Sequence, residues 1–200
     1  MISESEQLDD YLRETEVIDF PHPAIAALAD RLFHPSQTEL EKVKIAFEYV
    51  RDEIAHSWDI QSRRVTCSAS EVLTHKEGIC YAKSNLLAAL LRREGIPVGF
   101  CYQRLMLFDT PDKGYCIHAL NGVYLKSLKK WVRLDGRGNK EGVSAEFSVD
   151  QEKLAFGVQP EQGEKDYPVI YTAPHSKTIA VLKENDDALD MYLNGLPEDL

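Results

Sequence analysis

The chain has 200 residues, of which 44% are hydrophobic, so it can bury a substantial core and is not a disordered chain. It carries 23 lysines and arginines against 33 aspartates and glutamates, and the resulting net charge of −10 argues against a general nucleic-acid binder. The sequence has no apolar run of transmembrane length and no cationic start before an apolar signal core, so we expect a cytoplasmic protein with no membrane partner. We expect a single domain over residues 1–200, and its oligomeric state stays open.

The first part of the chain predicts helices. A short helix is expected over Ala24 to Phe33, and a second from Thr38 to Ile54, whose apolar residues recur on one face. Thr38 is suited to cap the second helix together with Glu41, three positions later. The segment from Arg63 to Lys76 is expected to form a loop with a short turn.

A third helix is predicted directly after Gly78-Ile79-Cys80. Leucines and alanines recur at helical spacing beyond Cys80, Arg92 and Arg93 fall in the last turn, and Gly95 followed by Pro97 supplies the stop. Gly78 permits a tight turn and a close backbone approach just before this helix.

Strands are predicted in the second half. Those expected are Val98 to Phe108, Tyr115 to Leu125 with a bulge at Asn121-Gly122, a strand ending at Asp135, Val143 to Val149, and Tyr167 to Thr172. A C-terminal helix is expected over Ser176 to Leu193. The predicted fold class is therefore α+β, with a helical part carrying Cys80 packed on an antiparallel sheet that carries His118 and Asp135.

Cys80, His118 and Asp135 together suggest a cysteine hydrolase. A thiol is a useful nucleophile only as a thiolate, and a helix N-terminus favours negative charge. An imidazole oriented by a carboxylate completes the chemistry. Taken singly, each residue is more often structural: Cys80 as an inert core residue, His118 as an ordinary buried or surface histidine, and Asp135 as a turn residue before Gly136.

Four ordered blocks remove that ambiguity. They are Glu71-Val72-Leu73 leading to Gly78-Ile79-Cys80, then Leu87 to Arg92 with Gly95-Ile96-Pro97, then His118 to Tyr124, then Trp131 to Asp135. From about Val43 to Phe147 the chain resembles the transglutaminase-like superfamily, a papain-like group that includes transglutaminases, peptide N-glycanases and bacterial cysteine proteases. The resemblance implies Cys80 as nucleophile, His118 as general base and acid, and Asp135 as the residue that orients the imidazole.

The chain departs from the family pattern at Leu120 and Gly122, and at Val98 to Gln103, where family members often carry an arginine. These departures bear on substrate identity more than on the triad. The backbone N–H of Cys80 is one expected donor to the oxyanion. The resemblance also suggests an upstream tryptophan as a second donor, and Trp58 is the candidate. Gln61 and Gln103 are weaker amide candidates.

The other cysteines suggest no cofactor. Cys67, Cys101 and Cys116 lack the paired spacing of a zinc site and read as small core residues, and no metal, nucleotide or other cofactor is expected. The predicted function is cysteine-dependent acyl transfer on an amide or peptide through a thioester, completed by water as in a peptidase or amidase. The alternatives are a protein-glutamine transglutaminase with an amine acceptor, a non-catalytic peptide-binding module, and a redox or metal-binding protein.

Overall fold

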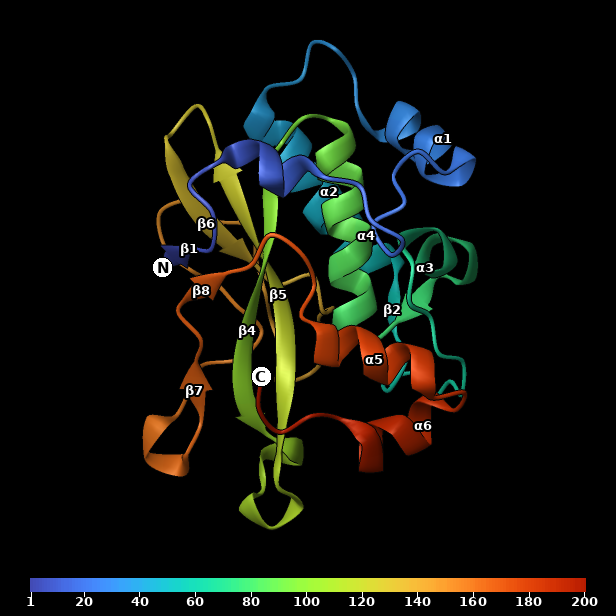
Figure 1. The fold of residues 1–200 in the computed structure, drawn as a ribbon, viewed down its shortest axis with the longest axis vertical. Coiled ribbons are helices and arrows are strands. Elements are labelled where there is room, and N and C mark those ends of the chain that lie inside the picture. The colour runs from blue at the N-terminus through green and yellow to red at the C-terminus, as the bar shows by residue number, and fades with distance from the viewer.

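The computed structural model describes residues 1–200, except for the side chains of Asp109 and Pro111. Helices lie beside a curved antiparallel sheet of four strands in the order β6-β5-β4-β7 (Figure 1). The α-helices are α1 (Pro23–Leu32), α2 (Glu39–Glu53), α3 (Ala69–His75), α4 (Cys80–Arg93), α5 (Ser176–Glu184) and α6 (Ala188–Asp190). The strands are β1 (Ile2–Ser3), β2 (Ala55–His56), β3 (Glu77–Gly78), β4 (Val98–Met106), β5 (Tyr115–Leu125), β6 (Lys130–Leu134), β7 (Lys165–Asp166) and β8 (Val169–Ile170). Short 3₁₀ turns span Leu8–Leu12, Leu107–Asp109, Pro111–Lys113 and Pro160–Gln162, and a π turn spans Met191–Gly195.

The α+β architecture expected from the sequence is confirmed. Helix α4 lies against the sheet formed by β4 and β5, and α2 and α3 pack on its other sides (Figure 1). Its residues from Cys80 to Arg92 are all buried, so this helix forms the centre of the main hydrophobic core. A helix that is enclosed all round is held by packing as much as by its own propensity, which makes its first residue a rigid place for a side chain.

Strand β5 runs without a bulge through Asn121-Gly122, which corrects the expected bulge. Its pairing with β4 continues in one register across Phe100↔Asn121 and Gly99↔Gly122. The Asn121 side chain donates to the carbonyls of Ser84 and Gly99, 3.2 and 3.3 Å away. These bonds and the two flanking strands override the turn tendency of the Asn-Gly pair.

The segments before α4 and after β6 differ from their predicted structure. The stretch expected to be a loop before α4 contains α3, because Ser68 and Glu71 form a reciprocal capping box that nucleates a helix of seven residues. The strand expected over Val143 to Val149 does not form, and this segment is a loop in which Lys140 and Val143 make a single bridge. The loop leads on to Ala155, whose backbone N–H donates to the Asp135 carboxylate at 3.1 Å.

The predicted C-terminal helix is interrupted after Glu184. Asp187 begins a new helix by accepting bonds from the backbone N–H groups of Leu189 and Asp190, so α5 and α6 are separate. The strand expected over Tyr167 to Thr172 is reduced to β8 and one bridge between Phe100 and Tyr171. Helices α5 and α6 lie near one end of α4 (Figure 1). No helix in the described part of the chain is both long and apolar enough to cross a membrane.

Candidate active site

Cys80 is the first residue of α4, and a short parallel pairing fixes the chain just before it. Strand β2 pairs with β3, so that His56 lies opposite Gly78. A side chain at Gly78 would lie 2.9 Å from the Thr66 hydroxyl and 3.1 Å from the Ala82 methyl group. The absence of a side chain there therefore allows the close approach that sets the start of the helix.

His118 and Asp135 come from adjacent strands. Strand β5 carries His118, and Asp135 follows the last residue of β6. The imidazole Nε2 donates to Asp135 Oδ2 at 2.8 Å, and His118 and Cys80 line the same cavity, with the thiol near enough to the imidazole to interact with it electrostatically. The three residues named from the sequence therefore meet in the order thiol, imidazole, carboxylate.

The carboxylate of Asp135 is held as an anion although it has no exposed surface. Burial alone raises the pKa of Asp135, but the charge and hydrogen bond of His118 and the backbone N–H groups of Ala155 and Arg137 outweigh it, so the pKa is lowered. The chain beyond β6 thus supplies two of the donors that stabilise this anion.

The imidazole of His118 is stabilised in its cationic form. Burial lowers the pKa of His118, but the negative charge of Asp135, the interaction with the neighbouring Cys80 and the hydrogen bond to Asp135 raise it well above its ordinary value. An imidazolium between a thiolate and a carboxylate is the arrangement that an acyl-transferring cysteine requires.

A cavity of about 340 Å³ opens on the thiol and the imidazole. One wall is aromatic: Trp58 stacks on Tyr192 with ring centroids 4.6 Å apart and an interplanar angle of 16°, and the Phe108 ring centroid lies 5.2 Å from that of Trp58. Elsewhere on the lining, Phe156 meets the His118 ring edge-on at a centroid distance of 5.1 Å. The site is thus enclosed by rings from four distant parts of the chain.

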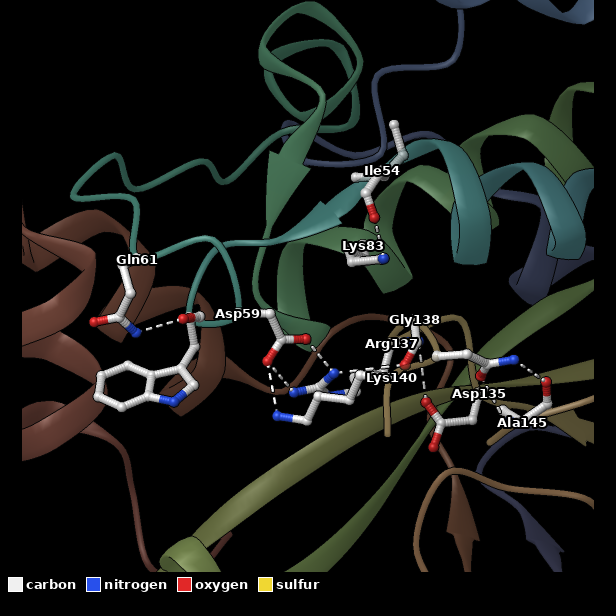
Figure 2. Close-up of polar contacts among 11 residues, drawn as sticks. Ile54, Asp59, Gln61, Lys83, Asp135, Arg137, Gly138, Lys140 and Ala145 are labelled. Atoms are coloured by element: carbon white, nitrogen blue, oxygen red, sulfur yellow. Dashed lines mark hydrogen bonds and ion pairs between the residues drawn. The ribbon is translucent and has the colours of Figure 1, made fainter. Parts of the chain in front are cut away.

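Polar contacts join the site to its surroundings (Figure 2). Arg137 is buried and binds the Asp59 carboxylate through two nitrogens at 2.5 and 2.8 Å, and Lys140 binds Asp59 at 2.8 Å. The fully buried ammonium of Lys83 donates to the Ile54 carbonyl at the end of α2. These contacts attach the segment after β2, the end of α2 and the loop after β6 to one another around the first turn of α4.

The other residues named from the sequence have different positions. Trp58 lies on the cavity wall, whereas Gln61 is in an exposed turn, where its amide donates to the Trp58 carbonyl at 2.6 Å. Gln103 is buried in β4 opposite His118. The donor role suggested for Trp58 stays a prediction.

The remaining cysteines are not alike. Cys101 is buried as expected, and burial raises its pKa to about 12. Cys67 is only half-buried, and burial followed by the charge of Glu71 raises its pKa to about 11. Cys116 is also half-buried and lines the same cavity as Cys80, so the description of all three as core residues is wrong for two of them. No cluster of three or more metal-ligating side chains occurs among the described residues.

Several cavity residues were not identified from the sequence. His56 carries a weak signal, since it lies two residues before Trp58 in a short β-rich stretch. Tyr192 and Leu196 carry none, because they are more than 100 positions beyond the nucleophile in a segment without a recognisable motif. Only the tertiary fold brings them to the site.

Comparison with known proteins agrees with this geometry. The family model of the transglutaminase-like superfamily matches residues 26–136, which include Cys80, His118 and Asp135. A candidate cysteine protease from Cytophaga hutchinsonii has a similar fold, with a TM-score of 0.53 and 18% identity over 66% of this chain and 43% of that one. The chain therefore spans less than half the length of that protein.

Two further structures are more distant. A TGase shares 20% identity over 69% of this chain and 37% of its own, with a TM-score of 0.44, and a candidate protease from Parabacteroides distasonis shares 17% over 62% and 25%, with a TM-score of 0.40. Scores this low do not bear on the fold. No curated protein sequence matches the chain. The family match covers more than half of the chain, and the protein belongs to the transglutaminase-like superfamily.

Proposed function

We propose that the protein catalyses acyl transfer from an amide or peptide through a thioester on Cys80. The observation that carries this proposal is the position of His118, which is hydrogen-bonded to Asp135 and lines, together with Cys80, a cavity large enough for an acyl group. A buried histidine with a merely structural role needs neither the thiol nor the cavity.

The proposed reaction uses each group in turn. The Cys80 thiolate attacks the carbonyl carbon, an S–C bond forms, and the C=O electron pair moves to the oxygen. The tetrahedral intermediate then expels the amine, which takes a proton from the His118 imidazolium, and a thioester remains. His118 is now neutral and can remove a proton from the incoming acceptor, while Asp135 keeps the ring oriented.

We further propose that water is the usual acceptor. Besides the Cys80–His118 pair, the charged residues in the described lining of the cavity are Arg137, Lys140 and Glu164. The Glu164 carboxylate accepts bonds from the backbone N–H groups of Met106 and Gln159, at 2.9 and 2.8 Å. Arg137 and Lys140 both bind Asp59, and both oxygens of Glu164 already accept backbone bonds, so the described lining has no carboxylate set aside to hold an amine acceptor. Water needs no such group, and this favours hydrolysis over transamidation.

The test is intact-protein mass spectrometry with a library of peptides and glutamine-containing substrates. We expect a mass increase on Cys80 equal to the acyl group, its decay in water, and neither event in Cys80→Ala. Adding a primary amine tests which acceptor the protein uses. If more amide product than free acid forms, the protein is a transglutaminase. Binding of peptides without any covalent adduct would instead identify a binding module.

A further inference from the structure

A second histidine lies in the cavity, and the reaction steps described above give it no role. His56 ends the short strand β2, where pairing with β3 places it opposite Gly78, two residues before the nucleophile. Backbone bonds from Ala55 to the Lys76 carbonyl and from Ser57 to the Gly78 carbonyl, at 2.9 and 3.3 Å, hold this segment in place. The position of the imidazole is thus tied to the same backbone that positions Cys80.

The polar contacts of His56 are incomplete. Only 4% of the residue is exposed, and its Nδ1 has no hydrogen-bond partner within the described part of the chain. The position of the proton on a neutral imidazole is set by the hydrogen bonds of its two nitrogens, and no described group accepts a proton from Nδ1. The Nε2–H tautomer avoids a buried unpaired N–H group and leaves Nε2 as the donor.

His56 is held in its neutral form. Burial lowers its pKa well below the ordinary value, and the positive charges of Arg137, Lys83 and His118 lower it further, against the opposing effect of Asp59. Such an imidazole is a poor proton acceptor but keeps an N–H donor at all pH values near neutrality. A neutral imidazole is known to serve as a hydrogen-bond donor to developing oxygen charge in other enzymes.

We propose that His56 is an oxyanion-site residue whose imidazole N–H donates to the negative oxygen of the tetrahedral intermediate on Cys80. The assignment rests on the proposed acyl-transfer function. When the thiolate adds to the carbonyl, the C=O electron pair becomes a full negative charge on oxygen, and this charge is absent from the bound substrate. A donor fixed in position before the reaction stabilises it selectively. The backbone N–H of Cys80, in the first turn of α4, is the second donor.

The surroundings of His56 differ from those of Trp58, the residue suggested by the family resemblance. One face of the Trp58 ring is covered by Tyr192, and Phe108 packs beside it, so Trp58 forms part of an aromatic wall. His56 instead meets Tyr192 edge-on, with ring planes at 90° and centroids 6.0 Å apart. Removing the N–H of His56 and removing that of Trp58 should therefore lower the acylation rate of Cys80 to different extents.

Two reactions of the same thiol test the proposal. Acylation of Cys80 by 4-nitrophenyl phenylacetate passes through an oxyanion, whereas alkylation by iodoacetamide needs the thiolate alone. In His56→Phe we expect acylation to fall about 100-fold while alkylation changes by less than about twofold. His56→Gln keeps an N–H donor and should recover acylation at least about tenfold over the phenylalanine variant. Trp58→Phe, the matched control, should lose less acylation than His56→Phe.

Each result decides a different claim. An unchanged ratio of acylation to alkylation in His56→Phe, or a larger loss in Trp58→Phe, overturns the donor role of His56. Equal losses of both reactions show a structural role and overturn it too. If wild-type Cys80 reacts with neither reagent, the thioester function itself is wrong, and the donor role fails with it.

If His56→Phe does not fold, the wild-type protein still provides a test. With ¹⁵N-labelled histidine, NMR should show His56 neutral at pH 7, and its N–H proton should shift downfield when phenylacetaldehyde forms a hemithioacetal on Cys80. A cationic His56, or a resonance unmoved by the adduct, contradicts the proposal.

Discussion

Two regions of the molecule contribute to the cavity in different ways. The family-matched stretch of residues 26–136 supplies Cys80, His118 and Asp135, each at a defined point of a helix or strand. Residues 137–200 supply Tyr192 and Leu196, from a π turn and the chain just beyond it. Under the proposed function, the first region therefore carries the bond-making chemistry, and the second completes an acyl-group site whose aromatic wall also includes Trp58 and Phe108.

The C-terminal segment is firmly attached although its regular elements are short. The backbone N–H of Ile117 donates to the Pro197 carbonyl at 2.9 Å, and Arg104 donates to the Glu198 carbonyl at 2.9 Å. These bonds connect the last residues of the chain to β4 and to β5, the strand that carries His118. The cavity wall that carries Tyr192 is thereby fixed relative to the core.

The largest expected effect is in the core. Asp135→Asn should lower turnover by about 10⁴-fold, because an amide neither stabilises the imidazolium nor holds its tautomer as the carboxylate does. The loss should be similar for all acyl donors if the core carries chemistry alone. Steady-state kinetics on a short and a bulky ester would check this. A loss confined to one of the two esters would show that the first region also takes part in recognising the acyl group.

A double variant sharpens the assignment of His118 and Asp135 as one unit. His118→Ala should be at least as damaging as Asp135→Asn, and the double variant should lose much less than the product of the two single losses, because residues that act together are not additive. Circular dichroism is the control for folding. Independent, multiplicative losses would remove Asp135 from the triad.

A smaller and more selective effect is expected in the C-terminal region. Tyr192→Ala removes the ring stacked on Trp58 and should lower kcat/KM for a phenylacetyl ester about tenfold relative to an acetyl ester. Alkylation of Cys80 by iodoacetamide should be unchanged. Tyr192→Phe, which keeps the ring, is the matched control, and equal losses for both esters would show that the segment does not select the acyl group.

The smallest expected effect concerns stability. Ser68→Ala removes the hydroxyl that accepts from the Glu71 N–H and should lower the free energy of unfolding by about 1 kcal/mol. Urea unfolding would measure it, with the exposed Ser176→Ala as the control. Packing on α4 holds α3 in place even without the cap, so the rate of Cys80 alkylation in the native protein should be unchanged. A slower alkylation would show that the cap also positions Cys80.

The sequence predicted the core well because its signals there are local. Apolar periodicity after Cys80 and the Thr38–Glu41 box correctly identified α4 and α2. The β-rich run from Tyr115 to Leu125 defined β5 to the residue. Helix and strand then dictate which side chains share a face, whereas the meeting of Cys80 with His118 was expected from the family resemblance.

The remainder depended on non-local contacts. The loop over Val143 to Val149 has the composition of a strand but does not join a sheet edge. Val143 lines the cavity, and Ala155, just beyond the loop, donates its N–H to the Asp135 carboxylate. The C-terminal break at Asn185 depends on Asp187, which caps α6 and also pairs with Arg63, 124 positions earlier in the chain. Such tertiary partners leave no periodic pattern.

The buried ammonium of Lys83 has a consequence for how the protein responds to alkali. Burial, followed by the charge of Arg137, lowers the pKa of Lys83 to about 7, against the opposing charges of Asp135, Asp59 and Asp52. In the unfolded chain a lysine titrates at about 10.4, so between those values the unfolded state holds a proton that the folded state has released. The contribution of Lys83 to stability is therefore least favourable below pH 7 and improves as the pH rises toward 10. Relative to Lys83→Met, the wild-type protein should therefore gain resistance to urea as the pH rises over that range.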